Sequence, residues 1–400
     1  MRRTHLAPAA LLMSLGLAAC STTTQPDPGV QQAPTATASA SPSATASPET
    51  AAPEVTGFDV REVATLSNPW AMAFLPGTDQ LLITQKSGEL LLRDRTSGAT
   101  ITVEGAPSVV DAGQGGFGDV VPGPTFQTDH MIYLSWVEAG SGGTSGAVIG
   151  TARLDSAGTT ARLTDLTVIW RQDKTTGSGH FSHRMVFSPD GQHLFVTSGD
   201  RQKMEPAQDL STNLGKILRL NFDGSPAAGN PFADRGGVSA EIWSYGHRNP
   251  LGIAFDADGR LWASEMGPQG GDEINLIVEG RNYGWPRASN GSHYGGGEIP
   301  DHAPGDGFEA PKVSWNPSIS PGSLMIYSGD RFAAWRGDAF VGALSGQALI
   351  RVDLDGENAT KADEWDMGQR IRAVVQAPDG GIWLLEDGGN GRLLELMPRS

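Results

Sequence analysis

Three polar segments flanked by glycine contain the side chains that could do chemistry. In Gly177–Arg184, His180 lies in a loop that enters a predicted strand, and a histidine there can act as a general base near neutral pH. In Trp243–Pro250, Arg248 and Asn249 present donors of the kind that bind carboxylates. Each segment also has an ordinary interpretation, a surface histidine for the first and a capped turn with a surface salt bridge for the second.

The third segment, Glu265–Asn275, combines the pair Gly267-Pro268 with several acidic side chains. A Gly-Pro loop exposes backbone carbonyls. Carbonyl and carboxylate oxygens are the hard ligands that Ca²⁺ takes in groups of about six to eight. This segment therefore favours a calcium site.

Other well-known catalytic motifs have no support in this chain. The string Gly113-Gln-Gly-Gly-Phe-Gly118 matches the dinucleotide-binding pattern in its letters, but Asp119-Val-Val-Pro follows it and cannot form the required helix. The sequence contains no G-x-S-x-G elbow and no H-E-x-x-H motif, so a serine hydrolase or a zincin is not indicated.

The elements that must position these loops are repeated hairpins. From Phe58 onward, a short apolar strand, a Pro/Asp/Gly turn and a second apolar strand recur about every 60 residues. The repetition predicts an all-β, six-bladed β-propeller with four-stranded antiparallel blades, whose long loops build the site. A two-sheet sandwich is the alternative. The six copies begin at Ala71, Asp119, Met185, Gly252, Leu324 and Val374.

Composition agrees with this fold class and narrows the range of partners. The 400 residues include 53 Gly and 26 Pro but only 18% charged residues, which argues against a mostly helical protein. A formal charge of −16 repels phosphate backbones, so nucleic acid is not an expected partner. A single cysteine excludes a disulfide within the chain and a Cys-rich metal site.

The N-terminus predicts export and lipidation. Arg2 and Arg3 precede the apolar stretch Leu6–Ala19, which is shorter than the ~20 residues of a membrane-spanning helix. The Leu17-Ala-Ala-Cys20 string resembles the bacterial lipobox, and an ordinary signal with a chance cysteine is the alternative. We therefore expect a signal peptide at 1–19, lipidation at Cys20, a disordered Thr/Ala/Ser/Pro-rich tether at 20–56 and the propeller at 57–400. The expected location is the bacterial cell envelope, outside the cytoplasm and anchored to a membrane.

Several short sequence motifs, which occur in the same order as in a known family, indicate a resemblance to that family. The series contains Gly-Gln-Gly-Gly, Gly-His-Phe, Leu214-Gly-Lys-Ile-Leu-Arg-Leu-Asn, Tyr245-Gly-His-Arg-Asn-Pro, Gly-Gly-Asp-Glu-Ile-Asn and Asn282-Tyr-Gly-Trp-Pro. From Val60 to about Pro398, the chain resembles the soluble quinoprotein aldose (glucose/sorbosone) dehydrogenases.

The resemblance implies a propeller that binds pyrroloquinoline quinone (PQQ) and Ca²⁺ and oxidises aldose sugars at C1 to lactones. His180 matches the general base, which takes the proton of the anomeric hydroxyl while hydride moves to the quinone. The carbonyls of Gly267 and Pro268 match ligands of the catalytic Ca²⁺, and Glu273 with the carbonyl of Tyr283 matches a further Ca²⁺ site. The positions that match cofactor contacts are Gln114, Gln208, Arg248, Asn249, Ser318, Arg370 and Arg372.

The resemblance also implies an aldose substrate and an electron acceptor, either the quinone pool or a redox protein. The chain departs from the family pattern at two positions. Leu251 stands where the family usually has Gln, and Ser345 stands where it commonly has Lys. The loss of that cation keeps open the alternative of a non-catalytic cell-surface propeller that binds sugar or a protein partner.

Overall fold

The computed structural model describes residues 57–399 and consists almost entirely of β-strands. The one α-helix of this part is the single turn α1 (Phe126–Asp129), and five short 3₁₀ turns lie in loops. None of these helices is long and apolar enough to cross a membrane. The prediction of an all-β protein is confirmed. The predicted signal peptide, Cys20 and the tether lie outside the described residues.

Four antiparallel sheets have four strands each. The strand order across the first sheet is β1 (Phe58–Leu66), β26 (Gly391–Pro398), β25 (Ile382–Glu386) and β24 (Ile371–Gln376). The second sheet has the order β10 (Ser182–Phe187), β11 (Leu194–Ser198), β12 (Lys216–Leu220) and β13 (Ile242–Tyr245), and the third has the order β14 (Pro250–Phe255), β15 (Leu261–Glu265), β17 (Asp272–Ile277) and β19 (Val313–Trp315). The fourth sheet has the order β20 (Pro321–Ile326), β21 (Ala339–Ala343), β22 (Ala348–Asp355) and β23 (Asn358–Asp366).

A fifth sheet has eight strands, in two antiparallel halves joined by a parallel pair at β5 and β9. Its order is β2 (Pro69–Phe74), β3 (Gln80–Gln85), β4 (Leu90–Asp94), β5 (Thr100–Glu104), β9 (Thr160–Arg171), β8 (Ser145–Ala157), β7 (Met131–Ala139) and β6 (Phe117–Pro122). A short ladder, β16 (Gln269–Gly270) with β18 (Gly291–Ser292), lies in the loops.

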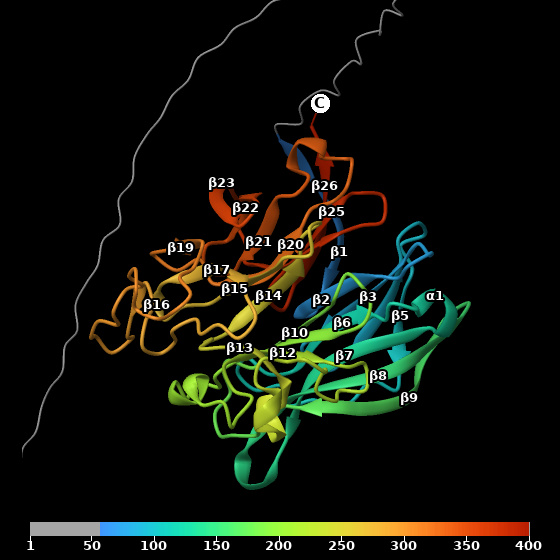
Figure 1. Cartoon of the computed structure of the whole chain (residues 1–400). Coiled ribbons are helices and arrows are strands. Elements are labelled where there is room, and N and C mark those ends of the chain that lie inside the picture. Colours follow the sequence, from blue (N-terminus) through green and yellow to red (C-terminus); the bar gives the residue numbers. More distant parts are fainter. Residues whose placement is uncertain (1–56, 400) are drawn as a thin grey trace, which may run out of the picture. The chain divides into compact units, whose positions relative to one another are not determined.

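Each repeated segment of the sequence forms an antiparallel hairpin, and the first strands of these hairpins form a closed ring. Strands β2, β6, β10, β14, β20 and β24 contact one another in this order, and β24 contacts β2. Figure 1 shows the labelled members of this set near the middle of the folded unit, with β9, β19 and β23 toward its outside. The ring brings the starts of six strands together.

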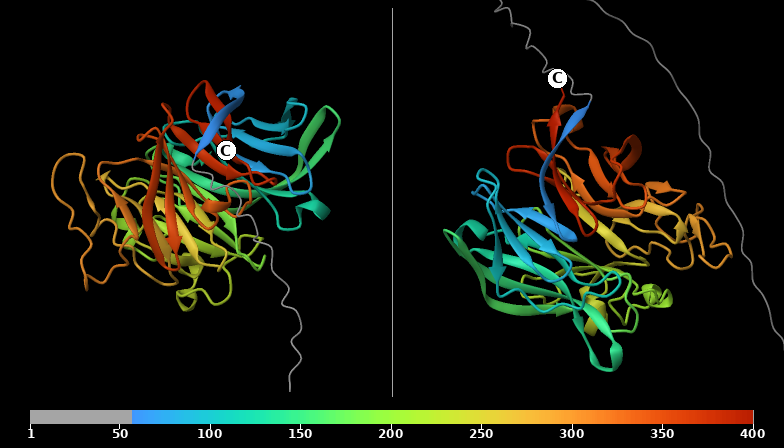
Figure 2. Two further views of the ribbon diagram at one scale, coloured as in Figure 1. Left: turned by 90° about the horizontal axis from the view of Figure 1, so that it is seen from above. Right: turned by 180° about the vertical axis from the view of Figure 1, so that it is seen from behind.

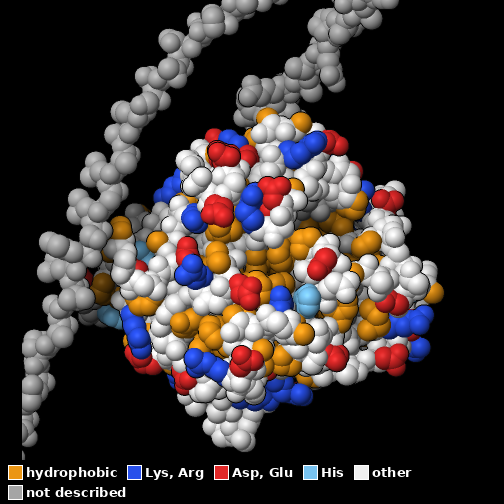
Figure 3. Space-filling model, in the orientation of Figure 1, with side chains coloured by type: hydrophobic (Ala, Val, Ile, Leu, Met, Phe, Trp, Pro, Cys, Tyr) orange, Lys and Arg blue, Asp and Glu red, His pale blue; other side chains and the backbone are white. Residues whose placement is uncertain are grey.

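Pairing between the two ends of the described chain completes one sheet. Strand β1 pairs antiparallel with β26, from Phe58 opposite Pro398 to Leu66 opposite Gly391. Figure 2 shows the blue first strand beside the red last strands. The hydrophobic core lies between adjacent sheets, as in the cluster that joins Trp262 and Ile274 of one sheet to Val341 and Ile350 of the next. Hydrophobic side chains also gather in the middle of the face in Figure 3.

All six ring strands have an irregular register near their first residues. The shifts lie between Pro69 and Ala71 in β2, and at the corresponding start of β6, β10, β14, β20 and β24. A bulge re-aims the side chain at which it occurs, and bulges are common next to active sites. These starts therefore direct side chains that a regular strand would place elsewhere.

Candidate functional site

One cavity lies at the starts of the ring strands and collects four of the residues that the sequence singled out. This cavity, called cavity A, has a volume of about 320 Å³, within the usual range for a small-molecule site. Trp70, His183, Leu251 and Arg372, all at the bulged starts, line it. The predicted cofactor residues in its lining are Gln114, Asn249, Arg370 and Arg372.

The two arginines of cavity A share one carboxylate. Arg370 Nε donates to Asp387 Oδ2 at 2.8 Å, and Arg372 donates to Asp387 Oδ1 through Nε at 3.0 Å and Nη2 at 2.8 Å. Burial lowers the pKa of Arg372, and Asp387 opposes that shift. Two guanidinium groups beside a single carboxylate leave an excess positive charge, which suits an anionic ligand.

His180 is held by its ring and by its backbone. Its Nδ1 lies 2.6 Å from Asp200 Oδ1, and its backbone N–H donates to Gln114 Oε1 at 2.7 Å. The side chain is 8% exposed, so the interpretation as a surface histidine is wrong. Burial lowers its pKa, and the hydrogen bond to Asp200 partly offsets this effect. Since Nδ1 is engaged, Nε2 is the nitrogen left to accept a proton.

Asp200 is a candidate site residue that the sequence analysis missed. It follows β11 and lies opposite the start of β10, and its side chain is fully buried. Trp285 Nε1 donates to its Oδ2 at 2.8 Å, and the backbone N–H of Gln202 donates to Oδ1 at 2.8 Å. Burial would raise the pKa of Asp200, but His180 and these donors outweigh it and lower the pKa. A carboxylate directly after a buried strand was the available signal.

A buried glutamate, Glu265, holds the Arg248-Asn249 loop in place through hydrogen bonds. Glu265 accepts the backbone N–H groups of both residues and bonds His247 Nδ1 at 2.9 Å. Arg248 Nη1 donates to the Met266 carbonyl at 2.9 Å, while Nε is buried without a partner. Arg248 is almost fully buried, so the interpretation as a surface salt bridge is wrong.

A second, smaller cavity, called cavity B, brings the predicted calcium ligands together. Gly267, Pro268, Glu273 and Tyr283 line it, together with Arg248. The lining also includes Glu265, which lies directly opposite Glu273 in the β15–β17 pair.

The two facing carboxylates of cavity B are buried and repel each other. Burial, followed by the charge of Glu265, raises the pKa of Glu273 to about 8. Nearby, Asp272 accepts the backbone N–H groups of Gly267, Ile319 and Ser320, which anchors the Gly-Pro loop. No group of three or more His, Cys, Asp or Glu side chains converges as a metal cluster in the described part of the chain.

Gln208 and Ser318 lie outside the lining of both cavities and connect the loops around them. The Gln208 amide bonds Asn282 Oδ1 at 2.9 Å and the Trp285 carbonyl at 2.7 Å. Ser318 Oγ accepts the Gly270 N–H at 3.0 Å. Both therefore support the loops of cavity B rather than line it in this structure.

A buried lysine secures the turn that carries Gln208. Lys216 Nζ donates to the carbonyls of Pro206, Ala207 and Leu214, at 2.7, 3.2 and 2.6 Å. Burial lowers its pKa to about 7. The sequence analysis assigned no role to this lysine, because its acceptors are carbonyls that only the tertiary structure brings together.

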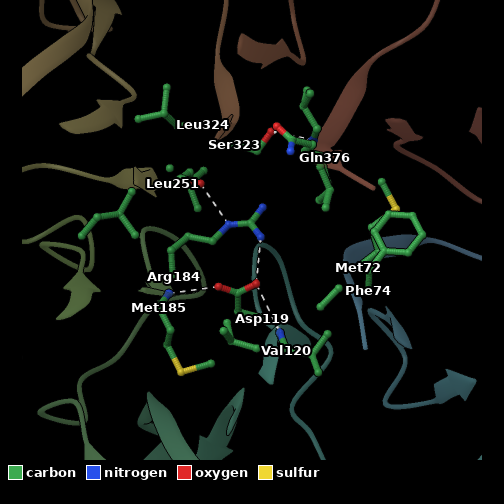
Figure 4. Close-up of a pocket in the computed structure, with 17 residues that line it drawn as sticks. Met72, Phe74, Asp119, Val120, Arg184, Met185, Leu251, Ser323, Leu324 and Gln376 are labelled. Carbon is green, nitrogen blue, oxygen red and sulfur yellow. Dashed lines mark hydrogen bonds and ion pairs between the residues drawn. The ribbon is translucent and has the colours of Figure 1, made fainter. Parts of the chain in front are cut away.

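The centre of the ring contains a buried ion pair of Arg184 with Asp119, and both residues line a further cavity of about 310 Å³. Arg184 Nη1 donates to Asp119 Oδ1 at 3.1 Å, and its Nε donates to the Leu251 carbonyl at 2.9 Å, as Figure 4 shows. The guanidinium carbon also lies 4.0 Å from the ring centre of Trp70. Arg184 therefore supports the tryptophan that lines cavity A.

Comparison with known proteins identifies the family. The model of the family described as glucose/sorbosone dehydrogenase matches residues 66–395. The chain belongs to this family. Glucose/sorbosone dehydrogenases are oxidoreductases, so the chain is an enzyme and the family predicted from the motifs is confirmed.

Individual members of the family match over most of their length. Aldose sugar dehydrogenase YliI of Escherichia coli is 39% identical over 342 residues, covering 84% of this chain and 91% of the relative. The crystal structure of the apo-form of the soluble E. coli aldose sugar dehydrogenase has a TM-score of 0.81 at 38% identity, covering 86% and 100% of the two chains. A PQQ-bound aldose sugar dehydrogenase from Streptomyces coelicolor has a TM-score of 0.70 at 30% identity, with coverages of 86% and 99%.

Proposed function

We propose that the chain oxidises aldose sugars at C1 to lactones, with PQQ as hydride acceptor and Ca²⁺ as its metal. The observation that carries this proposal is the buried His180–Asp200 pair, tied through Gln114 to a cavity with two arginines. Relatives named as aldose sugar dehydrogenases, one of them PQQ-bound, support the same activity.

The residues present suit a planar tricarboxylate such as PQQ. Arg370 and Arg372 offer guanidinium groups on one side of cavity A, and Asn249 supplies an amide. Arg248 Nε is a buried donor without a partner, which is costly unless a ligand accepts its hydrogen bond. Arg370 and Arg372 would hold carboxylates in cavity A, which Trp70 also lines, and Arg248, which lines cavity B, would donate to a carboxylate that reaches it.

The residues of cavity B suit Ca²⁺. Glu273 and Glu265 form a buried like-charge pair, which a divalent cation would relieve. Gly267, Pro268 and Tyr283 line the same cavity, and backbone carbonyl oxygens are hard ligands of the kind Ca²⁺ prefers. These residues would hold the metal.

The chain's own residues supply the proton chemistry of the reaction. Oxidation of the sugar removes a hydride from C1 and a proton from the anomeric hydroxyl. PQQ, when bound, supplies the hydride acceptor. His180 Nε2 accepts the proton, while Asp200 holds Nδ1–H and stabilises the imidazolium that forms. Burial of both side chains excludes bulk water from this step.

The sheets are best described as the six four-stranded blades of a propeller. Four sheets have four strands each, and the two halves of the eight-stranded sheet supply the other two blades. The closed ring of first strands and the pairing of β1 with β26 support this assignment. In such an arrangement the starts of the ring strands face one side, where cavity A lies.

Titration of the purified apo-protein with PQQ in the presence of Ca²⁺ tests the proposal. The substitution Ser345→Lys adds a second measurement, the change in quinone affinity. Ser345 is exposed, and its Oγ bonds the Ser318 carbonyl at 3.2 Å and Ser320 Oγ at 2.8 Å. Ser345→Lys adds a cation next to Ser318, so quinone affinity should rise about 10- to 100-fold, the size of one charged hydrogen bond. Absorbance or fluorescence titration measures it.

Ser156→Lys is the matched control for this substitution, because it adds the same charge at an exposed position away from both cavities. Its quinone affinity should equal that of the wild type. If the wild type binds no quinone at micromolar concentration and Ser345→Lys gains none, the dehydrogenase proposal fails in favour of a binding propeller.

We also propose a lipid anchor at Cys20, with electrons passing to a membrane quinone or a redox protein. The lipobox-like string before Cys20 supports the anchor. The mature protein should partition with membranes into detergent and gain the mass of a diacylglyceryl group on residue 20, whereas Cys20→Ala should leave that fraction. An unmodified mature chain that starts elsewhere and is free in the medium would overturn the anchor.

A further inference from the structure

Tyr294 is an exposed aromatic residue in contact with the proposed active site. Its side chain is 74% exposed, well above the other exposed large hydrophobic residues of the described chain, none of which exceeds 47%. The Arg248 guanidinium carbon nevertheless lies 5.8 Å from the Tyr294 ring centre and 5.3 Å from that of Trp285. One part of the tyrosine therefore contacts a buried site arginine, and the rest faces solvent.

A short hairpin holds Tyr294 in this position. The His293 N–H donates to the Gly297 carbonyl at 3.1 Å, and Ser292 bridges Glu298. The base of the hairpin pairs with the Gly-Pro loop through Gly291 and Gly270. Ser318 Oγ accepts the Gly270 N–H, so the hairpin is tied to the loop that carries Gly267 and Pro268 of cavity B.

A polar cavity, called cavity C, lies along the stem of the same hairpin. Its volume is about 370 Å³. Most side chains that line it carry amide, hydroxyl or carboxylate groups, which can form hydrogen bonds with sugar hydroxyls. Its two carboxylates disfavour anionic ligands. Its polar side chains are those of Asn290, Ser292, Glu298, Asp301 and Asn316.

We propose that Tyr294 and cavity C form a second sugar subsite, which binds the ring next to the reducing-end unit of an oligosaccharide. The inference rests on the proposed function, in which the reducing-end unit reacts at His180. A chain of contacts leads from His180 through Asp200, Trp285 and Arg248 to Tyr294.

Tyr294 is exposed whereas His180 and Arg248 are buried, and this difference assigns Tyr294 to the second sugar ring rather than to the ring that reacts. His180 and Arg248 are both less than 10% exposed, so the unit that reacts is held by buried groups. Tyr294 is the solvent-exposed end of this series of contacts, where the second sugar ring of the substrate would leave the buried site. An aromatic face gives apolar contact to the C–H groups of a sugar ring, and the polar groups beside it fix the hydroxyls.

Steady-state kinetics of the PQQ- and Ca²⁺-loaded enzyme with glucose and maltose test the subsite. In Tyr294→Ala, the ratio of kcat/KM for maltose to kcat/KM for glucose should fall about tenfold, whereas Tyr294→Phe should keep the wild-type ratio because the ring remains. Leu166→Ala removes another exposed hydrophobic side chain, on β9, and should leave the ratio unchanged. An unchanged ratio in Tyr294→Ala would overturn the subsite.

Calorimetry with methyl α-maltoside separates this inference from the proposed function, because the blocked anomeric hydroxyl prevents oxidation. The wild type should bind this ligand, and both Tyr294→Ala and Glu298→Gln should weaken binding several-fold. If the wild type oxidises neither sugar but binds the maltoside through Tyr294, the proposed function fails and the subsite stands. If Tyr294→Ala weakens PQQ binding and leaves maltoside binding intact, Tyr294 belongs to the cofactor site and the subsite inference is wrong.

Discussion

Replacement of His180 by alanine should lower sugar-dependent dye reduction by at least about 100-fold and leave quinone binding nearly intact. A general base contributes about that much to a rate, and His180 holds its free Nε2 in a buried position fixed by Asp200. Arg370 and Arg372, which we propose to bind the cofactor, are anchored by Asp387 and do not depend on the imidazole. Steady-state dye reduction and a quinone titration of the same preparation measure the two effects.

The control for this substitution is His193→Ala, which removes a histidine from the β10–β11 turn outside both cavities. It should keep wild-type activity. If His180→Ala retains more than a tenth of the activity, another residue is the base.

The pH profile gives a second measurement of the same residue. The imidazole must be neutral to accept a proton, so kcat/KM falls as the pH drops through the pKa of His180. Burial lowers that pKa from its ordinary value of 6.5, so the acid limb should lie below pH 6.5. Asp200→Asn removes a group that raises the pKa of His180, so the limb should move to still lower pH while the maximal rate falls.

Exhaustive chelation should abolish both quinone binding and activity, and Ca²⁺ should restore them better than Mg²⁺. The groups around cavity B are carboxylates and backbone carbonyls spread over several loops, an arrangement that suits the flexible, high coordination of Ca²⁺. Mg²⁺ demands a tighter octahedral shell. Quinone titration and dye reduction before chelation, after it and after each metal is added measure the effect.

Glu273→Gln should weaken the response to added Ca²⁺, because it removes one of the two facing carboxylates. Glu357→Gln removes a carboxylate from the exposed β22–β23 turn and should titrate with Ca²⁺ like the wild type. Full activity after exhaustive chelation would remove the metal from the mechanism.

Local sequence was sufficient to predict the strands because each hairpin is encoded by neighbouring residues. Alternating apolar residues around turns such as Pro189-Asp190-Gly191 specify a strand, a turn and a strand without help from distant parts of the chain, and Gly191 has the positive φ that the turn requires. The same local strings identified the family, since loops such as Tyr245–Pro250 are continuous in the sequence.

The relations between loops required the tertiary structure. Asp200 lies 20 residues from His180, and the two meet only because β10 and β11 pair. In the sequence, Glu265 and Glu273 are two acidic residues with no evident relation. The register of β15 and β17 places them opposite each other in a buried position. Their electrostatics depends on that burial, which no local pattern encodes.

The sequence by its own patterns determined the strand class, the order of the hairpins and the identity of the loops that carry polar groups. The closed ring of strands decided which of those groups meet, because its irregular starts aim Trp70 and Arg372 into cavity A, while Gln208 and Ser318 support the loops of cavity B. The physical reason is that hydrogen bonding in a hairpin is local. Burial, charge pairing and cavity shape arise only when segments far apart in the chain pack together.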